Sequence, residues 1–159
     1  MTTMTNSLPE LLRSLTDQDV ARVLAIGQHL SLPSGTVLFQ LGAEADRIFL
    51  VERGRIRLTL PMHVEGRDED ILVEERVPGE TVGWSALIPP HRFTLKGTAQ
   101  MDSGVVALPR IALLELFADR PALAYAITRN VAAVVGQRLQ VFQAMWLREV
   151  QRVVELRRT

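Results

Sequence analysis

Apolar residues follow three successive patterns along the chain. Between Leu8 and Leu30 they recur every three or four positions, which is the spacing of helices that bury one face. Thr16 followed by Asp19 resembles a capping box and predicts the start of the second of two N-terminal helices. The apolar positions of this segment are Leu11, Leu12, Leu15, Val20, Val23, Leu24 and Ile26.

From residue 35 to residue 108 the pattern changes to short runs of β-branched or alternating apolar residues, which predict strands. Glycines separate these runs and suit turns, because glycine adopts positive φ without steric cost. Short strands at regular spacing are typical of a small antiparallel barrel or sandwich. The glycines at or near the junctions are Gly42, Gly54, Gly66, Gly79, Gly83, Gly97 and Gly104.

After Pro109 the helical spacing returns, with a short helix over "RIALLELFADR" and a long one from Pro121 almost to Thr159. The sequence therefore predicts an α+β, mainly β fold. An antiparallel β-roll or jelly-roll-like barrel over residues 31–109 follows an N-terminal helical segment over 1–30. Residues 110–159 add the short helix and the long C-terminal helix.

The long helix carries an apolar stripe in its second half. Its spacing is heptad-like and predicts that two copies pair along it. The alternative is that the stripe packs on its own barrel. Pairing is favoured, because a straight helix rises ~1.5 Å per residue and outruns a small barrel. The stripe consists of Leu139, Phe142, Trp146, Val150, Val153 and Leu156, of which all but Leu156 are the predicted dimer interface.

Composition narrows the functional classes. The 159 residues suffice for one domain, 47% are hydrophobic and 23% charged, and 18 basic residues balance 18 acidic ones. No net charge attracts nucleic acid or anionic lipid, and the absence of cysteine excludes disulfides and thiolate sites. The N-terminus lacks signal-peptide features, and no apolar run approaches the ~20 residues of a membrane helix. We expect a cytoplasmic protein without membrane association.

Catalytic and metal-binding patterns are absent from the sequence. His29, His63 and His91 fall in different predicted elements, and the acidic stretch Glu65–Glu75 lacks the ligand spacing of a calcium loop. There is no Walker loop, no Gly-x-Ser-x-Gly motif and no nucleophile–base constellation. We therefore expect no metal site and no enzymatic activity.

Two stretches, "LPSGTVLFQLGAEADRIFLVERGRIRL" (Leu32–Leu58) and "VPGETVG" (Val77–Gly83), resemble the cyclic nucleotide-binding domain. That family includes the effector domains of catabolite-activator-type regulators, protein kinase A regulatory subunits and gated channels, and the order of elements is similar throughout. Its transcription factors continue into a winged helix-turn-helix. The present sequence ends at Thr159 with "QRVVELRRT", so no direct DNA binding is expected.

The resemblance implies a pocket in which amides of a short helix and one arginine hold a phosphate, while the glutamate of a Gly-Glu pair accepts from the ribose. Gly83 matches the glycine, but Trp84 stands at the glutamate and cannot accept a hydrogen bond. Phe93 stands at the arginine, with Arg92 one residue early, and a one-residue slip on a strand reverses the side chain. The candidate pocket residues are Gly83, Trp84, Ser85, Ala86, Leu87, Arg92, Phe93 and Thr94.

Two functions follow from this pocket. One is a ligand-sensing regulatory module that binds cyclic AMP or cyclic GMP weakly, or takes another ligand, and signals through its C-terminal helix to a partner protein. The other is a ligand-independent dimerisation scaffold. Trp84 and Phe93 either offer aromatic surface to a ligand or fill the core. No cofactor is assigned, and the possible ligands are a nucleotide or another small anionic or planar molecule.

Overall fold

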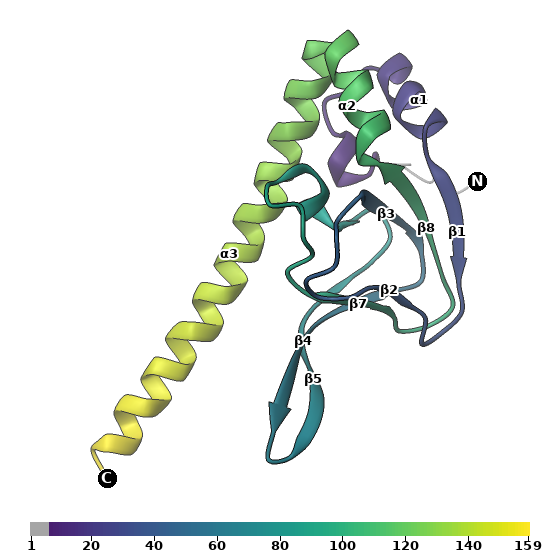
Figure 1. The fold of residues 1–159 in the computed structure, drawn as a ribbon. Helices are drawn as coiled ribbons and strands as arrows, with labels where there is room; N and C mark the ends of the chain where they lie inside the picture. Colours follow the sequence, from purple (N-terminus) through teal and green to yellow (C-terminus); the bar gives the residue numbers. More distant parts are fainter. Residues whose placement is uncertain (1–6) are drawn as a thin grey trace, which may run out of the picture.

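The computed structural model describes residues 7–159, and its centre is a β-roll of two four-stranded antiparallel sheets. One sheet has the strand order β1-β8-β3-β6 and the other β2-β7-β4-β5. This confirms the predicted antiparallel β-roll with a short and a long C-terminal helix (Figure 1). The strands are β1 (Gln28–Leu32), β2 (Val37–Phe39), β3 (Arg47–Arg53), β4 (Ile56–Val64), β5 (Arg67–Arg76), β6 (Thr81–Val82), β7 (Lys96–Ala99) and β8 (Ser103–Pro109).

The N-terminal region is less helical than the sequence predicts. It contains a single 3-10 turn, η1 (Glu10–Leu12), and one α-helix, α1 (Asp17–Ala25). The side chain of Thr16 accepts a hydrogen bond from the amide of Asp19, as predicted for the cap of α1. The helical prediction is wrong over Gln28–Leu30, which belong to β1. Glycine at position 27 allows the chain to approach β8 closely, because a Cβ there would clash with Val106 Cγ1 on that strand.

Asp19 links α1 to the loop between the two C-terminal helices. Its carboxylate accepts hydrogen bonds from Arg120 at 2.6 Å and from Arg22 at 2.8 Å. Burial by itself would raise the pKa of Asp19, but the hydrogen bonds from these two arginines outweigh it. The pKa of Asp19 is therefore held below its ordinary value.

The C-terminal helices are α2 (Arg110–Asp119) and α3 (Pro121–Arg157), as predicted. The first half of α3 packs beside η1, η2 and α2, while the second half leaves the β-roll (Figure 1). The predicted stripe is exposed, Trp146 by 66%, so the alternative that it packs on its own barrel is wrong. The residues of α3 buried against the body are Leu123, Ile127, Val131, Val134 and Arg138. Among residues 7–159, no helix is both long enough and apolar enough to span a membrane.

Candidate functional site

The short helix implied by the resemblance is a 3-10 turn, η2 (Trp84–Leu87), which directly follows β6. Its N-cap, Gly83, has a φ of 81° in the left-handed region. A Cβ at Gly83 would also come within 3.2 Å of the Phe49 ring and 3.3 Å of the Arg47 carbonyl oxygen. Glycine is thus required here by conformation and by space. Of the predicted residues in η2, Trp84 and Ser85 line the cavity described below, whereas Ala86 is fully buried in the core.

Phe93 lies inside the β-roll and packs on another aromatic ring. Its ring stacks on Phe39, with centroids 4.1 Å apart and planes 12° from parallel, and Phe39 in turn lies 6.0 Å from Phe49. Gly97 makes room for this stack, because a Cβ there would lie 2.6 Å from the ring of Phe39. The position at which the resemblance implies an arginine is therefore part of the aromatic core.

Arg92 does not reach the cavity. Its guanidinium is exposed and donates to the carbonyl oxygen of Gly42 at 3.0 Å. Residues 92–95 are not part of a regular strand, since β7 begins only at Lys96. The predicted strand is wrong over Phe93–Leu95, although the expectation that Phe93 and Arg92 point in different directions agrees with the structure.

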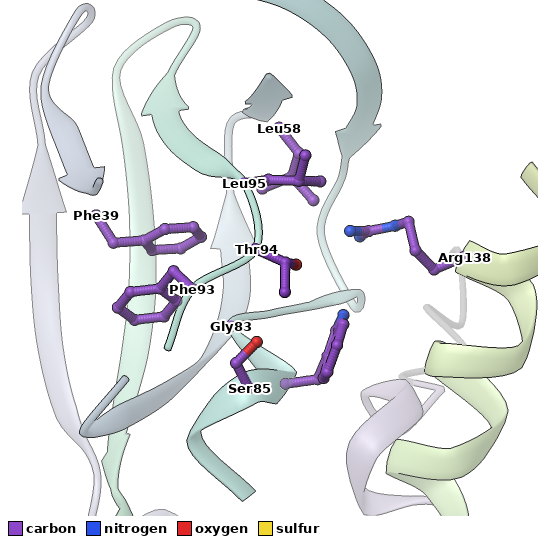
Figure 2. Close-up of a pocket in the computed structure, with 9 residues that line it drawn as sticks. Phe39, Leu58, Gly83, Ser85, Phe93, Thr94, Leu95 and Arg138 are labelled. Atoms are coloured by element: carbon purple, nitrogen blue, oxygen red, sulfur yellow. The ribbon is translucent and has the colours of Figure 1, made fainter. Parts of the chain in front are cut away.

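What remains of the pocket is a small cavity of about 10 Å³, close to the volume that one water molecule requires. Ligand sites for small molecules typically measure ~300–1,000 Å³. Figure 2 shows Phe39 and Phe93 on one side of the cavity, with Arg138 extending towards it from α3. The lining residues are Phe39, Leu58, Gly83, Trp84, Ser85, Phe93, Thr94, Leu95 and Arg138.

Arg138 is the residue of this site that the sequence reasoning missed. It is 7% exposed and donates from Nε to the carboxylate of Glu74 on β5. Burial lowers the pKa of Arg138, while the adjacent Glu74 acts in the opposite direction. Its position in the helical repeat could have predicted its burial, because Arg138 follows Val131 and Val134 on the buried face of α3.

Glu74 also belongs to an ion cluster centred on Arg76. It accepts from Arg76 at 3.0 Å, and Arg76 donates further to Glu10 at 2.8 Å and to Glu80 at 3.3 Å. The guanidinium of Arg76 is buried and also donates to the Thr81 carbonyl oxygen. The cluster therefore connects η1, β5 and the segment before η2, and Glu74 extends the connection to α3.

The predicted dimer interface lies on one exposed face of α3, on which Leu139, Phe142, Trp146 and Leu147 form a shallow groove. Gly136 precedes this groove, and a Cβ there would meet nothing within 4 Å. Its absence of a side chain is therefore not required by packing within residues 7–159, although glycine costs a helix about 1 kcal/mol relative to alanine.

The three histidines lie apart. His29 contacts Glu52, His63 contacts Asp68, and Nδ1 of His91 lies 3.3 Å from the carbonyl oxygen of Ser85. Within residues 7–159, no three His, Cys, Asp or Glu side chains are grouped closely enough to hold a metal ion.

Known proteins share this architecture. The family model for the cyclic nucleotide-binding domain matches residues 29–120. The cyclic AMP receptor protein of Thermus thermophilus is 27% identical over 130 residues, which are 82% of this chain and 57% of the relative. The present chain thus spans little more than half of that relative's length.

Two solved structures are similar to this chain over most of its length. The Thermus thermophilus catabolite activator protein has a TM-score of 0.71 at 25% identity, covering 89% of this chain and 63% of the other. A Geobacter metallireducens protein assigned to cyclic nucleotide binding has a TM-score of 0.68 at 30% identity, covering 81% of this chain and 91% of the other. Since the family model covers more than half of the sequence, the chain belongs to the cyclic nucleotide-binding domain family.

Proposed function

We propose that this chain is a non-catalytic regulatory module in which the ancestral nucleotide pocket no longer binds cyclic AMP or cyclic GMP tightly, and in which α3 transmits the signal by pairing with a second copy. The observation that carries this proposal is the small volume of the cavity, about 10 Å³, in which Phe39, Phe93 and Trp84 are among the lining residues. A cyclic nucleotide cannot enter such a volume unless several buried side chains move.

The chemistry of the lining residues supports the same conclusion. Trp84 offers no acceptor to a ribose hydroxyl, and losing such a charge-assisted hydrogen bond costs about 1.5–3 kcal/mol, or roughly ten- to a hundredfold in affinity. Phe93 offers no charge to a phosphate, and Arg92 is engaged with Gly42 outside the cavity. The missing ribose acceptor and the missing phosphate cation would both weaken the binding of a cyclic nucleotide.

Calorimetry with cyclic AMP and cyclic GMP tests the ligand half of the proposal. We expect no submicromolar binding to the natural chain. Binding gained only by the Trp84→Glu, Phe93→Arg double variant would support a site that lacks two side-chain contacts. Submicromolar binding to the natural chain would refute the proposal. If neither form binds, the closed cavity itself excludes the nucleotides, and this outcome favours the scaffold described below.

Sedimentation tests the pairing half. Phe142 lies on the exposed apolar face of α3, so Phe142→Glu places a charge in the proposed seam and is expected to convert a dimer into a monomer at micromolar concentration. Gln140→Glu is the matched control, because Gln140 is exposed but lies outside the predicted stripe. A natural chain that is monomeric at this concentration, and unchanged by Phe142→Glu, would contradict pairing.

The second candidate is a ligand-independent dimerisation scaffold, which the small volume of the cavity favours. Against it stands the polar part of the cavity lining, which includes Arg138, Ser85 and Thr94. A scaffold requires only that the cavity be filled, and polar groups are a costly way to fill it.

A further inference from the structure

The second half of α3 exposes more apolar surface than the proposed pairing stripe contains. At about 100° per residue, three side chains lie on the side of the helix opposite to the buried Arg138. These are Leu147, Val154 and the C-cap residue Arg158, which together we call the flank. Leu147 is 62% exposed and Val154 is 43% exposed. The flank therefore points away from the body of its own chain and adds an apolar surface beside the stripe.

The hairpin formed by β4 and β5 has one apolar face. Side chains alternate along a strand, so Met62 and Val64 lie on the same face of β4 as the buried Leu58. Leu58 lines the cavity to which α3 also contributes, so this face is on the side of the hairpin nearest to α3. The other face is polar, and there His63 contacts Asp68. Because Met62 and Val64 are exposed, the apolar face continues towards the hairpin turn without being covered by residues 7–159.

The hairpin and the second half of α3 leave the body together and have the same length. At their base, Glu74 of β5 accepts a hydrogen bond from Arg138. The residues from Glu74 to Gly66, at ~3.4 Å each, place the hairpin turn about 27 Å beyond this contact. The residues from Arg138 to Arg157, at ~1.5 Å each, place the end of α3 about 28 Å beyond it. Both segments project at the same end of the molecule (Figure 1).

We propose that the β4–β5 hairpin of each chain docks on the flank of α3 of a second copy. The proposal rests on the pairing of α3 proposed above and adds that the two helices run parallel. The pairing stripe is centred roughly 80° around the axis from Arg138, so in a parallel two-fold pair the two bodies lie on opposite sides of the plane that contains both helices. A flank that points away from its own body therefore faces the side on which the other copy carries its hairpin.

The apolar residues of the hairpin and of the flank lie at matching distances from the body. Measured from the contact that joins the two segments at their base, Met62 and Leu147 both lie about 14 Å away. Val64 lies about 20 Å and Val154 about 24 Å from the same contact. In a parallel pair the hairpin thus places an apolar side chain beside each apolar residue of the other copy's flank.

The two surfaces carry opposite charge at their ends. Residues 61–71 of the hairpin include four carboxylates and one arginine, whereas residues 148–158 include four arginines and two glutamates. Glu65 at the hairpin turn and Arg158 at the end of the flank form no ion pair within residues 7–159. A contact between Glu65 of one copy and Arg158 of the other would pair both charges. Since one chain provides both complementary surfaces, a second copy is the occupant that they favour.

Cysteine cross-linking tests the docking directly, because the natural sequence contains no cysteine. A chain carrying Met62→Cys is co-expressed with a differently tagged chain carrying Leu147→Cys, so that a disulfide joining the two tags forms only between copies. We expect this disulfide to form roughly tenfold faster than with His63→Cys in place of Met62→Cys, because only a cysteine on the apolar face is held close to the flank. His63 is the matched control, since it is exposed and lies on the opposite face of the same strand.

Charge reversal tests the polar end of the contact. In sedimentation at low salt, Glu65→Arg and Arg158→Glu should each raise the Kd of dimerisation roughly two- to fivefold, and the double variant should return the Kd towards that of the natural chain. Arg148→Glu is the matched control, because Arg148 is exposed on α3 but lies on neither the stripe nor the flank. It should not be rescued by Glu65→Arg.

The possible outcomes separate the docking from the pairing of α3. A dimer whose disulfide forms no faster with Met62→Cys than with His63→Cys would overturn the docking and leave the pairing intact. Charge reversals that have no effect, or that the double variant does not rescue, would overturn it as well. A natural chain that remains monomeric and does not cross-link would overturn the docking and the pairing together.

Discussion

We expect the ring of Phe93 to stabilise the fold. Phe93 stands at the position where the family resemblance implies an arginine. Phe93 is 6% exposed and stacks on Phe39. Truncation of a buried phenylalanine to alanine typically costs about 3–5 kcal/mol, and a stacked aromatic pair adds about 0.5–1.5 kcal/mol beyond its buried area. Because Thr94 beside it is exposed and the adjacent cavity offers some room to relax, we expect Phe93→Ala to cost about 3–4 kcal/mol.

Urea unfolding followed by circular dichroism measures this cost, provided that the m-value stays unchanged. The matched control is Ile111→Ala, since Ile111 is 70% exposed on α2 and its truncation should change the free energy of unfolding by less than about 0.5 kcal/mol. A cost below about 1 kcal/mol for Phe93→Ala would refute the argument that this ring fills the pocket, because a well-packed ring cannot be removed so cheaply.

Three other substitutions test contacts around the site and its supports. Gly97→Ala places a Cβ 2.6 Å from the Phe39 ring and should destabilise the fold by about 1–3 kcal/mol in urea unfolding; a neutral result would contradict the close packing of that ring. Thr16→Ala removes the side-chain cap of α1 and should cost about 1 kcal/mol by the same assay, which an unchanged midpoint would disprove. Because the pKa of Asp19 is lowered on folding, the ionised carboxylate adds to the free energy of unfolding at pH values above its unfolded-state pKa of about 3.9. This contribution is lost as the pH falls through the folded-state pKa. Asp19→Asn should therefore flatten the fall in unfolding free energy below roughly pH 4, and an unaltered acid profile would exclude this role.

Short sequence patterns predicted the structure correctly where interactions between residues close in sequence determine it. The cap at Thr16, the short α2 and the start of α3 at Pro121 all follow from signals within a few residues. The failure at Gln28–Leu30 has a tertiary cause. Leu30 fits a helical spacing, yet Gly27 brings the chain against β8, and pairing with β8 decides the conformation of this segment.

The candidate site was predictable only in part for a similar reason. The resemblance identified Gly83, Trp84 and Phe93, which lie at the cavity because they follow one another along the loops that form it. Arg138 reaches the same cavity from a helix 45 residues further along than Phe93, and its partner Glu74 is 64 residues away in sequence. No spacing rule connects such positions. The only local sign was a charged residue at a core-facing position of α3.

The position of Arg138 gives the two halves of the proposed function a common mechanical basis. Successive residues of an α-helix are about 100° apart around its axis, because one turn takes 3.6 residues. Arg138 is buried at the cavity, whereas its neighbour Leu139 is exposed and begins the proposed seam. A ligand that changes how Arg138 is held by Glu74 would act on α3 within one residue of the surface that pairs. Signalling from the cavity to the seam therefore needs no path through the β-roll, and Glu74→Gln should change the monomer–dimer equilibrium measured by sedimentation. A dimerisation constant unaffected by Glu74→Gln would show that the cavity and the seam are not coupled.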